Sequence, residues 1–388
     1  MFTAALIVLV LSGQIWTYRA LRSSLQGTSL SRHSVVPAAL AFLFALLLAV
    51  VWLDNTRSLG RLGNSPRPFS RALSLGAGIW VAGASAATAL LYGLTWVRRR
   101  LASAAPGAPD LSRRSFLWQA GQAAAVAVPF GAAAYGTLLV RRQLELRDVA
   151  FPVANLPAEL DGFRIALLTD IHYGPYLSAP ELDGAVEMAN ETRPHLTLVT
   201  GDFITRHGDP LQSCLERLSR LRAEAGVFGC LGNHEIYAGC EDLAQSRARA
   251  LGIEILRGRS RLLEFGGARL NLAGVDYQSQ RRPYLTGAGR LLHPGAVNLL
   301  MSHNPDVFPV AAELGYDLVV GGHTHGGQVT VEILEQTLNV GRFFTPFVTG
   351  LYRRGAAALY VSRGIGTINL PLRLGARPEV ALLRLSRA

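Results

Sequence analysis

Five short polar clusters hold the residues of this sequence that are best suited to chemistry. They carry aspartate, histidine and asparagine side chains, and each cluster follows a short apolar run. In chain order the clusters are Asp170-Ile171-His172, Gly201-Asp202, Gly232-Asn233-His234-Glu235, Ser302-His303-Asn304-Pro305 and Gly321-Gly322-His323-Thr324-His325. A lone histidine or Gly-Asp pair is usually structural, but five of the nine histidines lie in these clusters. The set as a whole therefore predicts one functional site.

The side chains in the clusters are those that a pair of divalent metal ions requires. Carboxylates, neutral imidazoles and an asparagine carbonyl bind Mn, Fe, Zn or Co. Two ions about 3.5–4 Å apart need a bridging ligand, and the two carboxylate oxygens make Asp202 the candidate. Extended residues at i and i+2 face one side, so Asp170 with His172, and His323 with His325, are expected to aim at one pocket. Neighbouring glycines would let the backbone approach the metals closely.

From residue 161 onward, short apolar runs alternate with amphipathic stretches, which is typical of an α/β layered domain. The pattern predicts strands at 165–169, 196–200, 227–231, 253–256, 261–265, 269–275, 296–301 and 318–320. It predicts helices at 180–190, 211–222, 240–250 and around 307–314. Ligands of open α/β sheets bind beyond the carboxyl ends of the strands. Because the five clusters follow five predicted strands, we expect them to point into one crevice.

In this order the clusters resemble the signature of the calcineurin-like metallophosphoesterase family, over about residues 161–385. The resemblance implies a four-layer α/β/β/α sandwich and a metal-dependent phosphoric ester hydrolase. It also implies which residues bind two metal ions: Asp170, His172 and His325 the first, Asn233, His303 and His323 the second, and Asp202 both. His234 would stay off the metals and contact the phosphate, as proton donor or transition-state stabiliser. A hydroxide that bridges the two metals would attack phosphorus.

The closer likeness is to the branch of transmembrane proteins with a metallophosphoesterase domain. It rests on Glu235, on the run Gly-Gly-His-Thr-His-Gly-Gly-Gln at 321–328, on Tyr-Val-Ser-Arg-Gly at 360–364 and on Leu-Pro-Leu-Arg at 370–373. Some members of the branch are linked to UDP-2,3-diacylglucosamine hydrolysis in lipid A synthesis, so a pyrophosphate hydrolase of that type is one alternative. A non-catalytic membrane sensor or scaffold is an alternative of another class, against which the complete ligand set and His234 argue.

The first part of the chain has a different composition. Residues 1–150 contain 15 arginines and 4 acids, a net charge of +11, whereas residues 151–388 contain 23 of each. Between the arginines lie apolar runs at 2–18, 35–53, 72–97 and 116–140, and a helix needs about twenty apolar residues to cross a bilayer. We therefore expect an all-α domain at 1–150 with about four transmembrane helices, and the phosphoesterase domain at 151–388. The first run could instead be a signal peptide.

Orientation and partners follow from the same charges. Arg113 and Arg114 precede the fourth run in a sequence that resembles a twin-arginine export signal, although they could equally be ordinary flanking charges. Both interpretations put the catalytic domain on the extracytoplasmic face of the cell membrane. The expected partners are the membrane and a phosphoester substrate, which four anchors suggest could be lipid-linked. No nucleic acid is expected, because the basic excess flanks the apolar runs.

Two further groups of residues have ordinary interpretations. Cys214, Cys230 and Cys240 lack a zinc-ligand spacing, and we expect buried thiols, with a Cys230–Cys240 disulfide as the alternative. Arg342 and Arg363 could contact a phosphate, but a solvated or structural role is the expectation for each.

Overall fold

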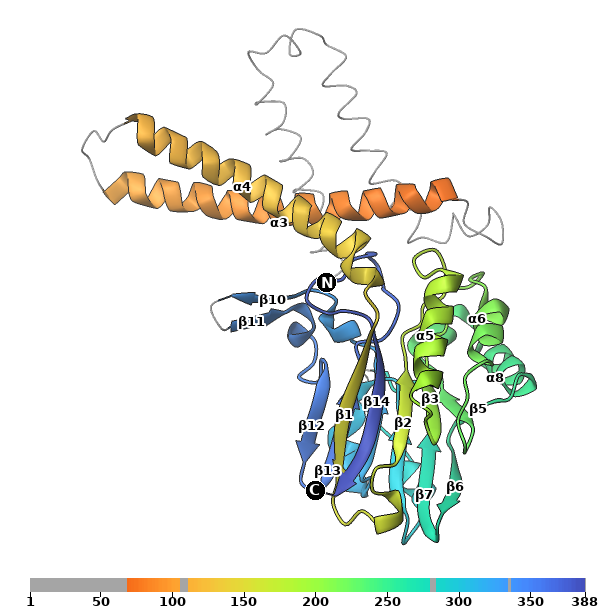
Figure 1. Ribbon diagram of the computed structural model, residues 1–388. Helices are drawn as coiled ribbons and strands as arrows, with labels where there is room; N and C mark the ends of the chain where they lie inside the picture. The colour runs from red at the N-terminus through yellow and green to blue at the C-terminus, as the bar shows by residue number, and fades with distance from the viewer. Residues whose placement is uncertain (1–67, 105–110, 280–283, 334–335, 388) are drawn as a thin grey trace. The chain divides into compact units, whose positions relative to one another are not determined.

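The computed structural model describes residues 68–104, 111–279, 284–333 and 336–387. The chain forms two compact units that divide between Leu139 and Val140. The described part of the first unit consists of two long helices, α3 (Pro68–Ala104) and α4 (Leu111–Leu138), which lie side by side (Figure 1).

Both helices are long and apolar enough to cross a membrane, over Ser74–Val97 and Phe116–Arg142. They pack closely where Phe130 of α4 lies on Gly83 of α3. A Cβ atom at Gly83 would stand only 2.7 Å from the Phe130 ring, so the small residue permits the contact. The predicted spans at 72–97 and 116–140 are thus helical, and those at 2–18 and 35–53 lie outside the described residues. The described part of the chain holds two candidate spans rather than the predicted four.

The second unit contains two six-stranded sheets and a hairpin (Figure 1). The first sheet has the order β1-β14-β2-β3-β4-β5, and the second has the order β12-β13-β9-β8-β7-β6. The strands of the first sheet are β1 (Glu145–Val153), β2 (Arg164–Leu168), β3 (Leu196–Thr200), β4 (Val227–Cys230), β5 (Ile253–Ile255) and β14 (Glu379–Arg387). Those of the second are β6 (Arg259–Phe265), β7 (Ala268–Gly274), β8 (Val297–Met301), β9 (Leu318–Gly321), β12 (Gly350–Arg354) and β13 (Ala357–Val361). The hairpin pairs β10 (Thr330–Ile333) with β11 (Gln336–Asn339).

Three apolar cores hold the layers together. Between the sheets, side chains such as Leu167 and Leu198 meet Leu272 and Leu299. The opposite face of the first sheet is covered by α5 (Ala179–Glu191), α6 (Leu211–Leu218) and α8 (Glu241–Ala250). The outer face of the second sheet is covered by α9 (Phe308–Leu314) and neighbouring loops. Since successive side chains of a strand face opposite ways, central strands such as β2, β3, β8 and β9 contribute side chains to two of these cores.

The predicted α/β class is confirmed, and the eight predicted strands and four predicted helices all form. Several strands lie beyond the prediction, namely β1, β10, β11, β12, β13 and β14. Within the first sheet β2, β3 and β4 are adjacent and parallel, and within the second β8 and β9 are adjacent and parallel. These five strands are the ones that precede the polar clusters.

Candidate metal centre

Six of the seven predicted metal ligands come together at the carboxyl ends of these five strands, and the seventh, Asn233, begins the short helix that follows β4. Donor atoms within 4.8 Å of one another form three overlapping groups: Asp170, His172 and His325; Asp202, His303 and His323; and His172, Asp202 and His234. The first group is the predicted first-metal set, and the second contains two of the predicted second-metal ligands with the predicted bridge. Six of the seven side chains are buried, and His323 is partly exposed. Such a set of oxygen and imidazole donors suits divalent transition metals.

Tight left-handed turns, rather than extended backbone, aim these side chains inward. In the described part of the chain ten non-glycine residues have a positive φ, and five of them are Asp170 (50°), His172 (47°), Asp202 (54°), His323 (72°) and His325 (52°). Such values are uncommon outside glycine and cluster at functional sites. The expectation that Asp170–His172 and His323–His325 converge through extended i and i+2 geometry is therefore wrong. The pairs converge because each strand ends in a left-handed residue.

Asp202 lies between two sets of histidine nitrogens. Its Oδ1 atom accepts a hydrogen bond from the His234 backbone N–H at 3.0 Å, which fixes the carboxylate. Its Oδ2 atom is 3.4 Å from His172 Nε2 and 3.1 Å from His303 Nε2. One oxygen thus faces both groups of donors, which is the placement that a bridging ligand needs.

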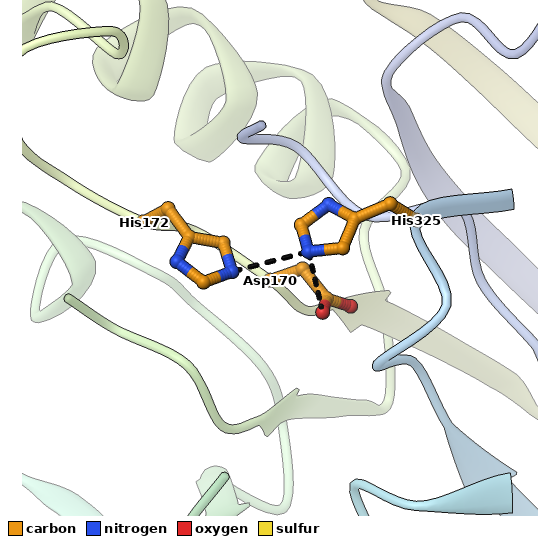
Figure 2. A group of neighbouring side chains, drawn as sticks. All are labelled: Asp170, His172 and His325. Carbon is orange, nitrogen blue, oxygen red and sulfur yellow. Dashed lines mark hydrogen bonds and ion pairs between the residues drawn. The ribbon is translucent and has the colours of Figure 1, made fainter. Parts of the chain in front are cut away.

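Figure 2 shows the first group, in which Asp170, His172 and His325 point toward one another. The Nε2 atoms of His172 and His325 are 3.1 Å apart, and His325 Nε2 is 3.3 Å from Asp170 Oδ1. Two ring nitrogens can approach this closely only if one carries a proton or a cation lies between them. The geometry fits a cation, since the third donor is a carboxylate.

Buried polar atoms without a hydrogen-bond partner mark the second group. They include Asn233 Oδ1 and His303 Nε2, and His303 Nε2 contacts Asp202 Oδ2 outside hydrogen-bond geometry. A buried acceptor with no partner carries a desolvation cost. A metal ion between Asn233, His303 and His323 would remove that cost. These residues therefore fit the second divalent metal ion that the sequence predicts.

The outer nitrogens of three histidines are anchored by the protein, which leaves the inner nitrogens for the site. His303 Nδ1 donates to the Thr200 carbonyl at 2.7 Å, and His234 Nδ1 donates to the Thr205 carbonyl at 2.5 Å. His172 Nδ1 is 3.0 Å from Thr205 Oγ1. Partners of this kind orient the ring and select the tautomer at metal sites. For His234 the anchored Nδ1 leaves Nε2 facing the site, where it can accept or deliver a proton.

The electrostatic state follows from burial and from the two aspartates. Burial raises the pKa of Asp170. Burial also disfavours charge on Asp202, but the neighbouring imidazoles of His303 and His172 hold its pKa well below the usual value for aspartate. Burial opposes a proton on His303, yet Asp202 raises the pKa of His303 to about 10. Burial lowers the pKa of His323 to about 3 and that of His234 below 6.5. In the metal-free site, His303 therefore carries the proton and the other two rings are neutral.

Two glycines make room for the carboxylates. A Cβ atom at Gly322 would stand 2.1 Å from Asp170 Oδ2, and one at Gly232 would stand 2.1 Å from Asp202 Oδ1. Both distances are shorter than any real side chain permits. The absence of a side chain at these two glycines thus lets Asp170 and Asp202 pack directly against the backbone of the neighbouring clusters.

Sequence reasoning missed the role of Glu235, which it treated only as a family mark. The Glu235 carboxylate is fully buried and accepts backbone N–H groups of Gly232, Asp202 and Phe203 at 2.8–2.9 Å. It therefore ties the Asp202 turn to α7 (Asn233–Ala238), the short helix that begins with Asn233. The sequence signal was present, because Glu235 occupies the third position of that helix, where a carboxylate caps exposed N–H groups.

Arg373 is a second residue whose role was missed, and no local pattern indicates its place. Its side chain is fully buried, and its guanidinium donates to the carbonyls of Arg363, Gly364, Gly366 and Ala376. The N–H groups of Ile365 and Gly366 in turn bond to Thr169 and Asp170. Arg373 thus holds the loop that supports the Asp170 backbone.

A cavity with both polar and apolar lining residues lies beside His323. It has a volume of about 270 Å³ and is lined by His323, Asn304, Asp306, Thr345 and Phe344, among others. The thiols of Cys214, Cys230 and Cys240 are free and buried, so the structure contains buried thiols and not the alternative disulfide.

Comparison with known proteins agrees with this site. Residues 163–327 match the family model for the calcineurin-like phosphoesterases. The chain is 30% identical to the phosphodiesterase YaeI of Escherichia coli, over 71% of this chain and 99% of that protein. It is 28% identical to the metallophosphoesterase YkuE of Bacillus subtilis, over 71% of this chain and 98% of that protein.

A vertebrate relative is also similar. The transmembrane protein with metallophosphoesterase domain of Danio rerio is 31% identical over 66% of this chain, and the match spans 60% of that protein's length. The family model and the near full-length match to YaeI coincide with the segment that carries the clustered aspartates and histidines. The chain belongs to the calcineurin-like phosphoesterase family.

Proposed function

We propose that this chain is a membrane-anchored phosphoesterase that hydrolyses phosphate mono- or diesters at a centre of two divalent metal ions. The observation that supports it best is the single Asp202 oxygen that faces two sets of buried histidine nitrogens. One ion would use only half of this arrangement, whereas two ions would use all seven side chains. The family membership of residues 163–327 supports the same reaction class.

Each of the seven side chains has an assigned place in the proposal. Asp170, His172 and His325 hold the first ion, Asn233, His303 and His323 hold the second, and Asp202 holds both. Bound together, the two ions would supply an activated water and neutralise charge on the phosphoryl oxygens. The backbone N–H groups on both aspartates keep these carboxylates oriented before substrate arrives.

His234 is the proposed catalytic residue. Its Nδ1–H is engaged by the Thr205 carbonyl, so only Nε2 can meet the substrate. Burial keeps the pKa of this ring low in the substrate-free site, and an adjacent phosphate charge would raise it. His234 would then hold a proton at Nε2 and donate it to the leaving oxygen.

A lipid-linked substrate on the extracytoplasmic face is the finer part of the proposal. Phe344 lines the cavity beside His323, the adjacent residue Phe343 is an exposed apolar side chain, and so is Leu338 of β11. Together with two helices long enough to span a membrane, they favour a substrate with an apolar part. The arginine pattern around 98–114 supports the extracytoplasmic orientation.

The test uses the purified full-length protein in detergent. Metal content is measured by mass spectrometry, and hydrolysis is measured on bis(p-nitrophenyl) phosphate and then on phospholipid and nucleotide-lipid panels. His325→Ala is expected to abolish hydrolysis, whereas His293→Ala, outside the site, should not change it. An active His325→Ala protein, or a metal-free active wild type, would overturn the proposal.

Sidedness is tested separately by labelling. Glu187 is exposed on α5, and the native thiols are buried, so Glu187→Cys offers one accessible thiol in the second unit. A membrane-impermeant maleimide should label it in intact cells. Labelling only after the cells are opened would place the catalytic unit in the cytoplasm and contradict the proposed orientation.

A further inference from the structure

A second cavity lies apart from the predicted metal ligands, and it gathers arginines from distant parts of the sequence. Its volume is about 230 Å³, and its lining includes Arg147 of β1, Arg342 of the short helix Val340–Phe343 and Arg363 after β13. Thr337 and Thr349 add hydroxyl groups to the wall. None of the seven predicted metal ligands lines it.

The guanidinium groups of the three arginines differ in the hydrogen bonds and ion pairs that they already make. Arg363 is buried and fully engaged, because its guanidinium bonds to Glu379 at 2.6 Å and also to Glu145. Arg147 approaches Glu145 only to 4.0 Å. Within the described part of the chain, no hydrogen bond or ion pair holds the Arg342 guanidinium. Three arginines and no acidic residue thus line the cavity, and the two glutamates near it, Glu145 and Glu379, both bond to Arg363.

We propose that this cavity is a second anion-binding site, which takes a phosphate group between Arg147 and Arg342. The planar guanidinium forks of two arginines suit the oxygens of a phosphate, and threonine hydroxyls can donate to the remaining oxygens. Arg363 forms a rigid, charge-neutral part of the wall rather than a ligand. An isolated surface arginine is normally solvated, but here two of them, 195 positions apart in the sequence, border one hollow.

The site shares a wall with the metal centre. Gly326 lines the cavity and directly follows His325, and a Cβ atom at Gly326 would stand 2.6 Å from Arg363 Cγ. On the other side of Arg363, a Cβ atom at Gly364 would stand 2.5 Å from Asp170 Cβ. The two sites are thus separated by the Arg363 side chain. The phosphate group has two possible sources: a free phosphate compound, or a lipid headgroup that lies beside the reacting one. The inference goes beyond the proposed function and does not require it.

The experiment measures phosphate binding by the full-length protein in detergent, by calorimetry. It is carried out in the Asp202→Asn background, so that phosphate bound at the metal centre does not contribute. Arg342→Ala and the double variant Arg147→Ala/Arg342→Ala should each bind inorganic phosphate at least about tenfold more weakly. Arg353→Ala removes an exposed arginine of the neighbouring β12 that does not line the cavity, and it should bind like the parent.

Two outcomes decide the proposal, and a further comparison identifies the source of the phosphate. Equal phosphate affinity in the parent, Arg342→Ala and Arg353→Ala proteins would overturn it. Weaker binding confined to the cavity variants supports it. In nanodiscs of phosphatidylcholine with phosphatidate, loss of inorganic phosphate binding relative to pure phosphatidylcholine discs identifies a headgroup as occupant. Unchanged binding identifies a soluble phosphate. Because the metal centre is disabled throughout, failure of the proposed hydrolysis leaves this test intact.

Discussion

The two sheets contribute different chemistry to the candidate metal centre. Loops after β2, β3 and β4 of the first sheet supply both carboxylates, Asp170 and Asp202, with His172, Asn233 and His234. Loops after β8 and β9 of the second sheet supply only imidazoles, namely His303, His323 and His325. The negative charge therefore belongs to one sheet and neutral or cationic rings to the other. The site exists only where the sheets meet, and a bound ion would join them.

Removing the shared carboxylate should have the largest effect. Asp202→Asn removes the negative charge of the carboxylate whose Oδ2 atom lies 3.4 Å from His172 Nε2 and 3.1 Å from His303 Nε2, so we expect both ions to be lost and kcat/KM to fall by about a thousandfold or more. Metal content by mass spectrometry and diester hydrolysis check this. Asp148→Asn is the matched control, because Asp148 is an exposed carboxylate paired with Arg384. Two ions retained in Asp202→Asn would contradict the bridging role.

His234 offers a test within the first sheet that leaves the ligands untouched. His234→Ala should lower kcat by about a hundredfold, the usual contribution of a positioned proton donor, while both ions stay bound. Steady-state kinetics and metal analysis on one preparation separate the two effects. A fully active variant would rule out the assigned role, and a variant that loses metal would make His234 a ligand.

The charge difference between the sheets predicts a pH dependence of metal affinity. Burial disfavours a proton on His303, but Asp202 raises its pKa to about 10, above the unfolded value of about 6.5. That proton stabilises the metal-free fold below about pH 6.5, and the stabilisation is lost as pH rises through about 10. A metal must displace it, so affinity should rise about tenfold per pH unit between about 7 and 9. Manganese titrations check this, and His303→Gln should flatten the slope.

The readout for metal removal is stability rather than turnover, and it tests whether the ions join the sheets. Each ion at about a thousand times its dissociation constant contributes about 4 kcal/mol, so two contribute about 8 kcal/mol. For a domain of this size chelation should lower the melting temperature by about 20 °C. Thermal unfolding of the full-length protein with and without chelator measures the shift. Asp202→Asn should not respond to the chelator, and an equal response in both proteins would indicate a different origin.

The sequence predicted the site better than the fold around it. Each cluster follows a buried apolar run, so the carboxyl ends of β2, β3, β4, β8 and β9 could be located from local pattern alone. β14 was missed although it contains the apolar run 380–383, and its first residue, Glu379, is a fully buried carboxylate that a local pattern would place in solvent. Burial there depends on Tyr360 and Arg363, which bond to Glu379 from another strand and its following loop. Partners from distant parts of the sequence cannot be inferred from the local alternation of apolar and polar residues.

Arg373 illustrates the same limit in the site itself. A fully buried arginine contradicts the usual preference of this residue for solvent. Its partners are four backbone carbonyls of the loop 363–376. Every residue has a backbone carbonyl, so residue types do not show which carbonyls will accept these hydrogen bonds. The left-handed turns at Asp170 and His323 were also beyond prediction, since neither residue type implies a positive φ.

Those left-handed turns set a condition for protein engineering. Each places a residue with a side chain at a positive φ that glycine adopts without steric strain, at a cost of about 1–3 kcal/mol in stability. A grafted centre that copied only the identities and Cβ positions of Asp170, His172, Asp202, His323 and His325 would miss their backbone geometry. A host scaffold would have to offer turns that already tolerate glycine at those five positions. In this chain, backbone strain two to four residues beyond the strand ends orients the side chains of the site.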